Sequence, residues 1–359
     1  MASHNRPSIM AHAARAFAGA LAPRPSPRLR ARRGSPVRAS AADAAVGANA
    51  DFGPDNRLRF TRPSLTRKSA PPGAPPIVIL PGFGNNTKDY VNPFGDPDVS
   101  LVASLRARGW DVHVVDLERK DWAKILRAVF SLGFWRGDGT TEPGYTWYLE
   151  RVDATVRAAL AANPGATAVD LVAHSAGGWL ARAYIGGALN EVRWDRFRYL
   201  ARDPEPAPPP KHAVPHPNVR RLVTLGTPQR TASGPNANDA TRGALRWVNE
   251  RWPGATYASE GVRYACVTGR TVRGVAGKEA KGTLPGYSCN SYVQVCGEGD
   301  GVIGDAVVPN DFALLDGAAT FVLDGVFHSM SKVGTYDEDS GEVWYGSESV
   351  VDAWLGELL

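Results

Sequence analysis

Ser175 is the residue in this sequence whose surroundings are best suited to covalent chemistry. It lies in residues 169–178 (VDLVAHSAGG), where an apolar run predicts a strand and the following residues predict a helix. A serine hydroxyl becomes a nucleophile when a base removes its proton and a tight strand-to-helix turn lifts it clear of the chain. Such a turn requires small residues two positions before and after the serine, and Ala173 and Gly177 meet this requirement. The alternative, a serine that only caps a helix, is disfavoured by the preceding strand and the small flanking residues.

The base expected to activate this serine is His328. It follows a predicted strand near the C-terminus, in residues 321–329 (FVLDGVFHS), where the chain order serine, acid, histidine would place it. The other histidines belong to a basic N-terminal segment, to a strand, to the position beside the serine, or to a proline-rich stretch: His4, His12, His113, His174, His212 and His216. We expect the side chain of His174 to point away from the turn. The alternative for His328 is a core or surface histidine.

The acid that would orient His328 is sought in residues 299–309 (GDGVIGDAVVP). Asp305 precedes a Val-Val-Pro run, which is a common setting for such an aspartate, and Asp300 precedes a similar Gly-Val-Ile run. We favour Asp305 and keep Asp300 as the alternative. Whichever of the two does not orient His328 is expected to be a plain loop aspartate.

Two backbone N–H groups are expected to stabilise the oxyanion that forms when a serine attacks a carbonyl carbon. One belongs to Ala176, directly after the nucleophile, and the second should come from a loop after an earlier strand. Residues 80–84 (LPGFG) form such a loop, with the Phe83 N–H as the favoured donor. The alternative is an ordinary glycine turn.

Strands that alternate with helices would bring these residues together. The sequence predicts strands at 76–80, 111–116, 169–173, 220–225 and 320–323 with Val326, and helices at 101–108, 145–162 and 177–189. This alternation predicts an α/β fold with a mostly parallel central sheet and helices on both faces.

The chain divides into three expected parts. Residues 1–40 read as a plastid transit peptide, residues 41–75 as a disordered or loop-like segment, and residues 76–359 as the catalytic domain. Three insertions with lid-like character are expected in the domain, at 119–144, 202–218 and 229–298. The aromatic segment 119–147 either walls an apolar pocket with the last insertion or contributes ordinary core residues.

The positive charge is confined to the N-terminal segment. Residues 1–40 contain eight arginines and no lysine, aspartate or glutamate, and without them the formal net charge of +5 becomes −3. The basic pI therefore gives no indication of nucleic-acid binding. An acid-free segment rich in Arg, Ser, Ala and Pro, with VRAS at 37–40, favours a chloroplast address. A mitochondrial address and a merely disordered basic tail are the alternatives.

Composition excludes several other classes. No run of 18 or more uncharged apolar residues occurs, so no membrane-spanning helix is predicted. The cysteines Cys266, Cys289 and Cys296 are too few and too widely spaced for a disulfide framework or a zinc site. Whether Cys289 pairs with Cys296 stays open.

With these residues in place, the chain from about residue 76 to 359 resembles the α/β-hydrolase superfamily. More narrowly, it is similar to plant plastid-targeted lipase-like proteins grouped with the PGAP-like GPI inositol-deacylases. The resemblance is carried by LPGFGNNT at 80–87, HSAGGWLAR at 174–182, LGTP at 225–228, GDAVVP at 304–309 and DGVFHS at 324–329. Ala173 and Ala306 stand where the family pattern has glycine. The GDAVVP match strengthens Asp305 over Asp300.

The resemblance implies a serine ester hydrolase that acts through an acyl-enzyme, with no metal ion or organic cofactor. The expected substrate is a small-molecule or lipid ester, with acyl glycerolipids of a plastid membrane as the favoured class and peripheral membrane contact. An acyltransferase on the same scaffold and a non-catalytic binding protein are the alternatives. A GPI-specific deacylase is disfavoured, because the sequence predicts neither a secretory signal nor a spanning helix. The acyl chain, the head group and the oligomeric state stay open.

Overall fold

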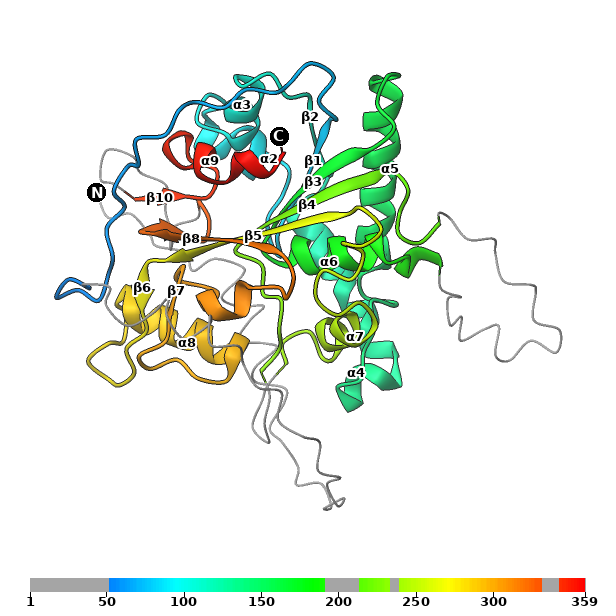
Figure 1. Ribbon diagram of the computed structural model, residues 1–359. Coiled ribbons are helices and arrows are strands. Elements are labelled where there is room, and N and C mark those ends of the chain that lie inside the picture. The colour runs from blue at the N-terminus through cyan, green and yellow to red at the C-terminus, as the bar shows by residue number, and fades with distance from the viewer. Residues whose placement is uncertain (1–51, 191–212, 233–238, 331–341, 359) are drawn as a thin grey trace, which may run out of the picture. The chain divides into compact units, whose positions relative to one another are not determined.

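Short apolar runs of the sequence pair into one parallel sheet at the centre of the computed structural model (Figure 1). The structure describes residues 52–190, 213–232, 239–330 and 342–358. In spatial order the strands are β2 (Val112–Val114), β1 (Ile77–Leu80), β3 (Val169–His174), β4 (Val219–Leu225), β5 (Arg263–Arg270) and β8 (Ala319–Asp324).

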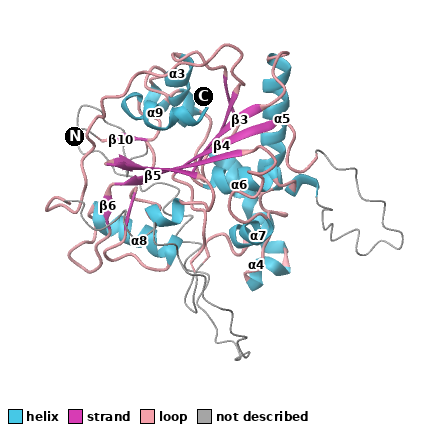
Figure 2. Cartoon of the chain, viewed as in Figure 1, coloured by secondary structure: helices cyan, strands magenta, loops and turns pink. Residues whose placement is uncertain are grey.

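The central strands are largely buried because both faces of this sheet are covered. Figure 2 shows helices on both sides of the strands. All four residues of β1 and all six of β3 are buried, which is typical of a parallel sheet between two helical layers. The register pairs Leu80 with Ala173 and His174 with Leu225, so these strands end at one edge of the sheet.

One face of the sheet packs against α5 (Thr146–Ala162), α6 (Ala176–Ile185) and α7 (Ala244–Arg251). Apolar residues of α5 recur at helical spacing, and Leu149, Val152 and Val156 are buried in this layer.

The opposite face packs against α2 (Lys88–Val91), α3 (Leu101–Arg106) and α9 (Glu348–Trp354). The Ser100 side chain caps α3 by accepting a hydrogen bond from the Ala103 N–H at 3.0 Å.

Shorter elements lie around this frame. Two pairs of short strands are β6 (Val272–Arg273) with β7 (Ile303–Gly304) and β9 (Val326–Phe327) with β10 (Val343–Trp344). The remaining α-helices are α4 (Leu132–Arg136) and α8 (Leu284–Cys296). The 3-10 segments are η1 (Pro93–Gly95), η2 (Arg119–Phe130), η3 (Ala188–Asn190), η4 (Asn310–Ala313) and η5 (Leu355–Leu358).

The predicted fold class is confirmed, since six parallel strands form the central sheet. One expected boundary is wrong: residues 229–298 are not a continuous insertion, because they contain the central strand β5 and the packing helix α7. The sequence of β5, RYACVTGR, has arginines at both ends and polar residues within, so it lacks the continuous apolar run that marks β1. The expected insertion 119–144 contains η2 and α4.

Other expectations fall partly or wholly outside the described residues. The segment 1–40 lies outside them, as do residues 202–212 of the proline-rich stretch. Cys289 and Cys296 are free thiols on α8. No helix in the described ranges is both long and apolar enough to cross a membrane.

Candidate active site

Ser175 occupies a sharp turn between the end of β3 and the start of α6. Its backbone has φ 51° and ψ −129°, a conformation that L-residues rarely adopt, and its side chain makes no capping hydrogen bond to the helix. A Cβ atom on Gly177 would lie 2.6 Å from the Leu80 carbonyl oxygen, and one on Gly82 would lie 2.6 Å from the Ser175 Cβ. The turn therefore tolerates only small residues around the serine, as its sequence pattern predicts.

Three side chains from distant parts of the chain form one hydrogen-bonded line. The Ser175 Oγ lies 3.0 Å from the His328 Nε2, and the His328 Nδ1 lies 2.8 Å from the Oδ2 of Asp305. Asp305 is fully buried and His328 is 5 % exposed. The structure thus brings together the residues that the sequence proposes as nucleophile, base and acid.

The loop after β7 holds the Asp305 carboxylate rigidly. Its Oδ1 accepts hydrogen bonds from the backbone N–H groups of Val307 at 3.0 Å and Val308 at 2.7 Å. The Asp305 carbonyl oxygen accepts the His328 backbone N–H at 2.9 Å. Asp305 and His328 are therefore fixed to each other through both side chain and backbone.

Asp300, the alternative acid, lies apart from this line. It is exposed, and its Oδ1 accepts a hydrogen bond from the Ala276 N–H at 2.8 Å. The structure pairs His328 with Asp305 and places Asp300 in the turn before β7.

The two backbone groups expected at the oxyanion lie beside Ser175. Ala176 is the first residue of α6, where the partial positive charge of the helix N-terminus is concentrated. Phe83 follows Gly82, which packs on Ser175. The centroid of the Phe83 ring lies 5.2 Å from that of the Trp122 ring. Within the described ranges, neither the Ala176 nor the Phe83 N–H donates a hydrogen bond to another residue.

Two supporting residues of this site were not anticipated as such from the sequence. Tyr345 donates a hydrogen bond to the Asp305 Oδ2 at 2.7 Å. Gly226 has φ +58°, and a Cβ there would lie 2.6 Å from the Asp305 Oδ2 and 3.0 Å from the His328 Nδ1. In the sequence, Gly226 is marked by the Leu-Gly-Thr-Pro motif, which begins at the last residue of β4.

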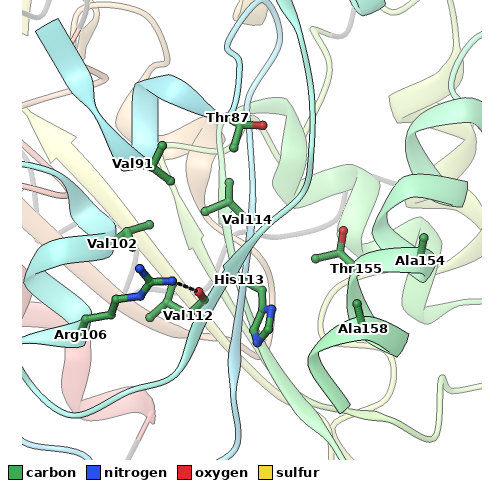
Figure 3. A pocket seen from close by; sticks show the side chains of 10 residues that line it. All are labelled: Thr87, Val91, Val102, Arg106, Val112, His113, Val114, Ala154, Thr155 and Ala158. Carbon is green, nitrogen blue, oxygen red and sulfur yellow. Dashed lines mark hydrogen bonds between the residues drawn. The ribbon is translucent and has the colours of Figure 1, made fainter. Parts of the chain in front are cut away.

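A surface hollow of about 460 Å³ lies elsewhere, beside the edge strand β2 (Figure 3). Its lining includes Arg106, whose guanidinium donates a hydrogen bond to the Val112 carbonyl at 2.9 Å, and Thr155 of α5. None of the residues in the line from Ser175 to Asp305 borders it. Among the described residues, no group of three or more His, Cys, Asp or Glu side chains is placed to hold a metal ion.

The comparison with protein families gives one match. The family described as "Alpha/beta hydrolase family" matches residues 77–331 of this chain. Among curated proteins, none matches the chain in sequence.

Several solved structures are similar to this chain at low identity. The lipase of Staphylococcus hyicus is 11 % identical, with 82 % of this chain and 97 % of that chain covered and a TM-score of 0.46. EstA from Clostridium botulinum is 12 % identical, with 89 % and 94 % covered and a TM-score of 0.44. Lipase 1 from Pelosinus fermentans is 11 % identical, with 79 % and 98 % covered and a TM-score of 0.42. The family assignment does not depend on these likenesses.

Proposed function

The chain belongs to the alpha/beta hydrolase family, and on this premise we propose that it is a serine ester hydrolase. The observation that carries the proposal is the hydrogen-bonded line from the Ser175 hydroxyl through the His328 ring to the buried Asp305 carboxylate. A serine, a histidine and a carboxylate in this order form the group that activates an alcohol for acyl transfer.

The direction of proton movement follows from the hydrogen bonds. The His328 Nδ1–H donates to Asp305, so the Nε2 lone pair faces the Ser175 hydroxyl and accepts its proton. The Ser175 oxygen then bonds to the ester carbonyl carbon, and the carbonyl oxygen becomes an oxyanion. Asp305 stays ionised and stabilises the positive imidazolium.

The oxyanion is held by the N–H groups of Ala176 and Phe83, with the N-terminus of α6 adding a favourable partial charge. When the intermediate collapses, the carbon–oxygen bond to the alcohol breaks, and His328 gives its proton to the departing alkoxide. His328 next takes a proton from water, the hydroxide attacks the acyl-enzyme, and Ser175 regains its proton as the acid product leaves.

An acyl lipid is the proposed substrate class, with contact to a membrane surface. Four large apolar side chains on η2 and α4 are more than half exposed: Leu126, Phe130, Leu132 and Trp135. The Trp135 indole N–H is already bonded to the Val129 carbonyl oxygen at 2.7 Å. Exposed large apolar side chains within one short segment are typical of an interaction surface, and their apolar character supports lipid. For a plastid-targeted chain, the membrane glycerolipids are the nearest candidates.

Hydrolysis of p-nitrophenyl butyrate by the full chain tests the proposal. Ser175→Ala is expected to lower kcat by at least about 1,000-fold, because no other group takes the place of the nucleophile. Ser259→Ala is the matched control, since Ser259 is exposed and its hydroxyl bonds to the neighbouring Glu260. A fluorophosphonate should label the wild type and Ser259→Ala, but not Ser175→Ala. A folded Ser175→Ala variant with the wild-type rate would overturn the proposal.

Product analysis with plastid lipids then tests the substrate class. Incubation in water should release free fatty acid, and added alcohols should not divert most of the acyl groups. A dominant acylated acceptor would instead identify an acyltransferase.

A further inference from the structure

His174 is a buried histidine beside Ser175 that takes no part in the proposed proton transfers. It is 1 % exposed, and both of its ring nitrogens have partners. The Nδ1 lies 2.7 Å from the Tyr90 hydroxyl, and the Nε2 lies 2.8 Å from the carbonyl oxygen of His328. A series of hydrogen bonds through Tyr90 and His174 therefore connects two segments of the site on the α2 side of the sheet.

The protons in this hydrogen-bond series can be assigned from the groups at its two ends, the Gly82 N–H and the His328 carbonyl oxygen. The Tyr90 oxygen accepts the Gly82 backbone N–H at 3.1 Å, so the Tyr90 hydroxyl proton is free to be donated to the Nδ1 of His174. The Nε2 faces a carbonyl oxygen, which can only accept, so it carries the His174 proton. Every donor thus has an acceptor when His174 is neutral.

The surroundings keep His174 in that neutral form. Burial, and secondarily the nearby His328, lower the pKa of His174 to about 3. A second ring proton would turn the Nδ1 toward the Tyr90 oxygen as a donor and leave the Tyr90 O–H without its acceptor. The order of hydrogen bonds is therefore fixed across the neutral pH range.

Each end of this hydrogen-bond series holds a segment that the proposed reaction uses. At one end, Gly82 packs on Ser175 and precedes Phe83, the proposed second oxyanion donor. At the other end, the backbone of His328 is bonded on both sides: its N–H to the Asp305 carbonyl oxygen at 2.9 Å, and its carbonyl oxygen to His174.

We infer that Tyr90 and His174 are positioning residues that hold the Gly82–Phe83 loop and the His328 backbone at a fixed separation across Ser175. This inference rests on the proposed function. The oxyanion donors and the base must both be in place when charge develops, and small displacements at that moment cost much of the rate. Loss of the hydrogen bonds through Tyr90 and His174 should therefore lower kcat. KM should change little, because neither residue touches the substrate.

A purely structural role predicts a different result, and the protein contains a matched pair that reports it. Tyr184 and His216 form a second buried tyrosine–histidine hydrogen bond, at 2.8 Å, between α6 and the segment before β4. Tyr184→Phe removes a buried hydroxyl away from Ser175 that bonds to a histidine and also to the Asp153 Oδ1 at 3.1 Å. It should lower the free energy of unfolding without the specific loss of kcat.

The experiment measures kcat, KM and the pH profile of kcat/KM with p-nitrophenyl butyrate for Tyr90→Phe, His174→Asn, His174→Gln and Tyr184→Phe. Tyr90→Phe keeps the ring but leaves the Gly82 N–H and the His174 Nδ1 without a partner. An asparagine amide can reach the Nδ1 position only, and a glutamine amide can reach the Nε2 position and donate to His328.

The expected result is a loss of kcat on the order of tenfold for Tyr90→Phe and His174→Asn, with KM nearly constant. The double variant Tyr90→Phe with His174→Asn should lose less kcat than the product of the two single losses, because both substitutions break the same series of hydrogen bonds. His174→Gln should be closer to the wild type than His174→Asn. Folded Tyr90→Phe and His174→Asn variants with wild-type kcat would overturn the inference.

Two further outcomes also count against it. An equal loss of kcat in Tyr184→Phe would show a general effect of destabilisation. Failure of both Tyr90→Phe and His174→Asn to fold would show a structural role only.

A measurement that needs no turnover separates this inference from the proposed function. The proton on the His328 Nδ1, bonded to Asp305, should give a downfield NMR signal that shifts or broadens in Tyr90→Phe and stays in place in Tyr184→Phe. If the wild type hydrolyses no ester, the proposed function fails. An unmoved signal in folded Tyr90→Phe makes the positioning role fail on its own.

Discussion

Tyr345 and His328 bind the same oxygen of Asp305, at 2.7 Å from the Tyr345 hydroxyl and 2.8 Å from the His328 Nδ1. The Tyr345 oxygen also accepts the Gly269 N–H at 2.7 Å, so its own proton is available for the carboxylate. Burial, and secondarily the charge of Asp305, raise the pKa of Tyr345 well above its usual value, which keeps the hydroxyl protonated. Tyr345 and His328 therefore both donate hydrogen bonds that stabilise the buried carboxylate of Asp305.

Tyr345→Phe should lower both stability and activity. The change leaves the Gly269 N–H without an acceptor and removes one donor from Asp305, which we expect to cost about 1–3 kcal/mol of unfolding free energy. The value of kcat should fall on the order of tenfold, because the carboxylate is no longer held at its present angle to His328. In an Asp305→Asn background, the same change should have little further effect on kcat. Equal losses in both backgrounds would contradict this coupling.

The two candidate acids should respond very differently to the same substitution. Asp305→Asn replaces the acceptor of the His328 Nδ1–H with an amide and should lower kcat by roughly 10³–10⁴-fold, because the imidazole loses its orienting charge. Asp300→Asn is the matched control in an exposed turn and should keep the wild-type kcat. Steady-state rates with p-nitrophenyl butyrate decide between them, and a larger loss in Asp300→Asn would reverse the assignment.

Much of this site could be predicted because its residues lie at the ends of easily read strands. The apolar residues of β1, β3 and β4 indicate where these strands end at one edge of the sheet, and Ser175 directly follows β3. The choice between Asp305 and Asp300 is harder, because both precede similar apolar runs in the sequence. The structure distinguishes them by the burial of Asp305 and by its hydrogen bond to His328.

The parts that could not be predicted depend on contacts through space. No spacing in the sequence relates Tyr345 to Asp305, and nothing around Tyr90 indicates that it reaches His174 across two elements. The strand β5 escaped prediction for a local reason: its neighbours bury it on both faces, yet its sequence mixes threonine, glycine and arginine with apolar residues.

Gly226→Ala should impair the site through a direct clash. A Cβ at this position would lie 2.6 Å from the Asp305 Oδ2 and 3.0 Å from the His328 Nδ1, and the backbone has φ +58°. Gly261→Ala is the matched control, because Gly261 has φ +95° but no atom within 4 Å of the place where the new methyl group would stand. Both variants should lose about 1–2 kcal/mol of stability from backbone strain.

Only Gly226→Ala should also lose activity, on the order of 100-fold in kcat, since the clash displaces Asp305 from His328. Thermal unfolding and steady-state kinetics of the two variants separate strain from displacement. A similar kcat in both would show that the site absorbs the extra methyl group.

The stability of the protein should fall in acid, partly because of His174. The pKa of His174 is lowered from 6.5 to about 3 in the folded chain, mainly by burial. Below its ordinary pKa the unfolded chain binds a proton that the folded chain does not, so His174 contributes stability above that pH and loses it as the pH falls toward about 3. In this window the contribution decreases by ~1.4 kcal/mol per pH unit.

His174→Gln removes this titration and should therefore flatten the pH dependence of the unfolding free energy in that window. Urea unfolding of the two proteins at several pH values gives the comparison, and the difference in slope matters rather than the difference in stability at neutral pH. Parallel curves would mean that His174 has the same proton affinity in both states.

The surface formed by Leu126, Phe130, Leu132 and Trp135 should decide how the protein meets lipid. Phe130 is 76 % and Leu132 is 71 % exposed, so their apolar area is free to enter a bilayer surface. Phe130→Ser with Leu132→Ser should lower binding to phospholipid vesicles on the order of tenfold or more, because two buried apolar contacts are lost from the bound state. The matched control exchanges Leu65 and Val293, two exposed apolar residues outside this surface, for serine. Vesicle flotation measures binding, the rate with p-nitrophenyl butyrate verifies that each variant is folded and active, and equal flotation of the two double variants would assign membrane contact to another surface.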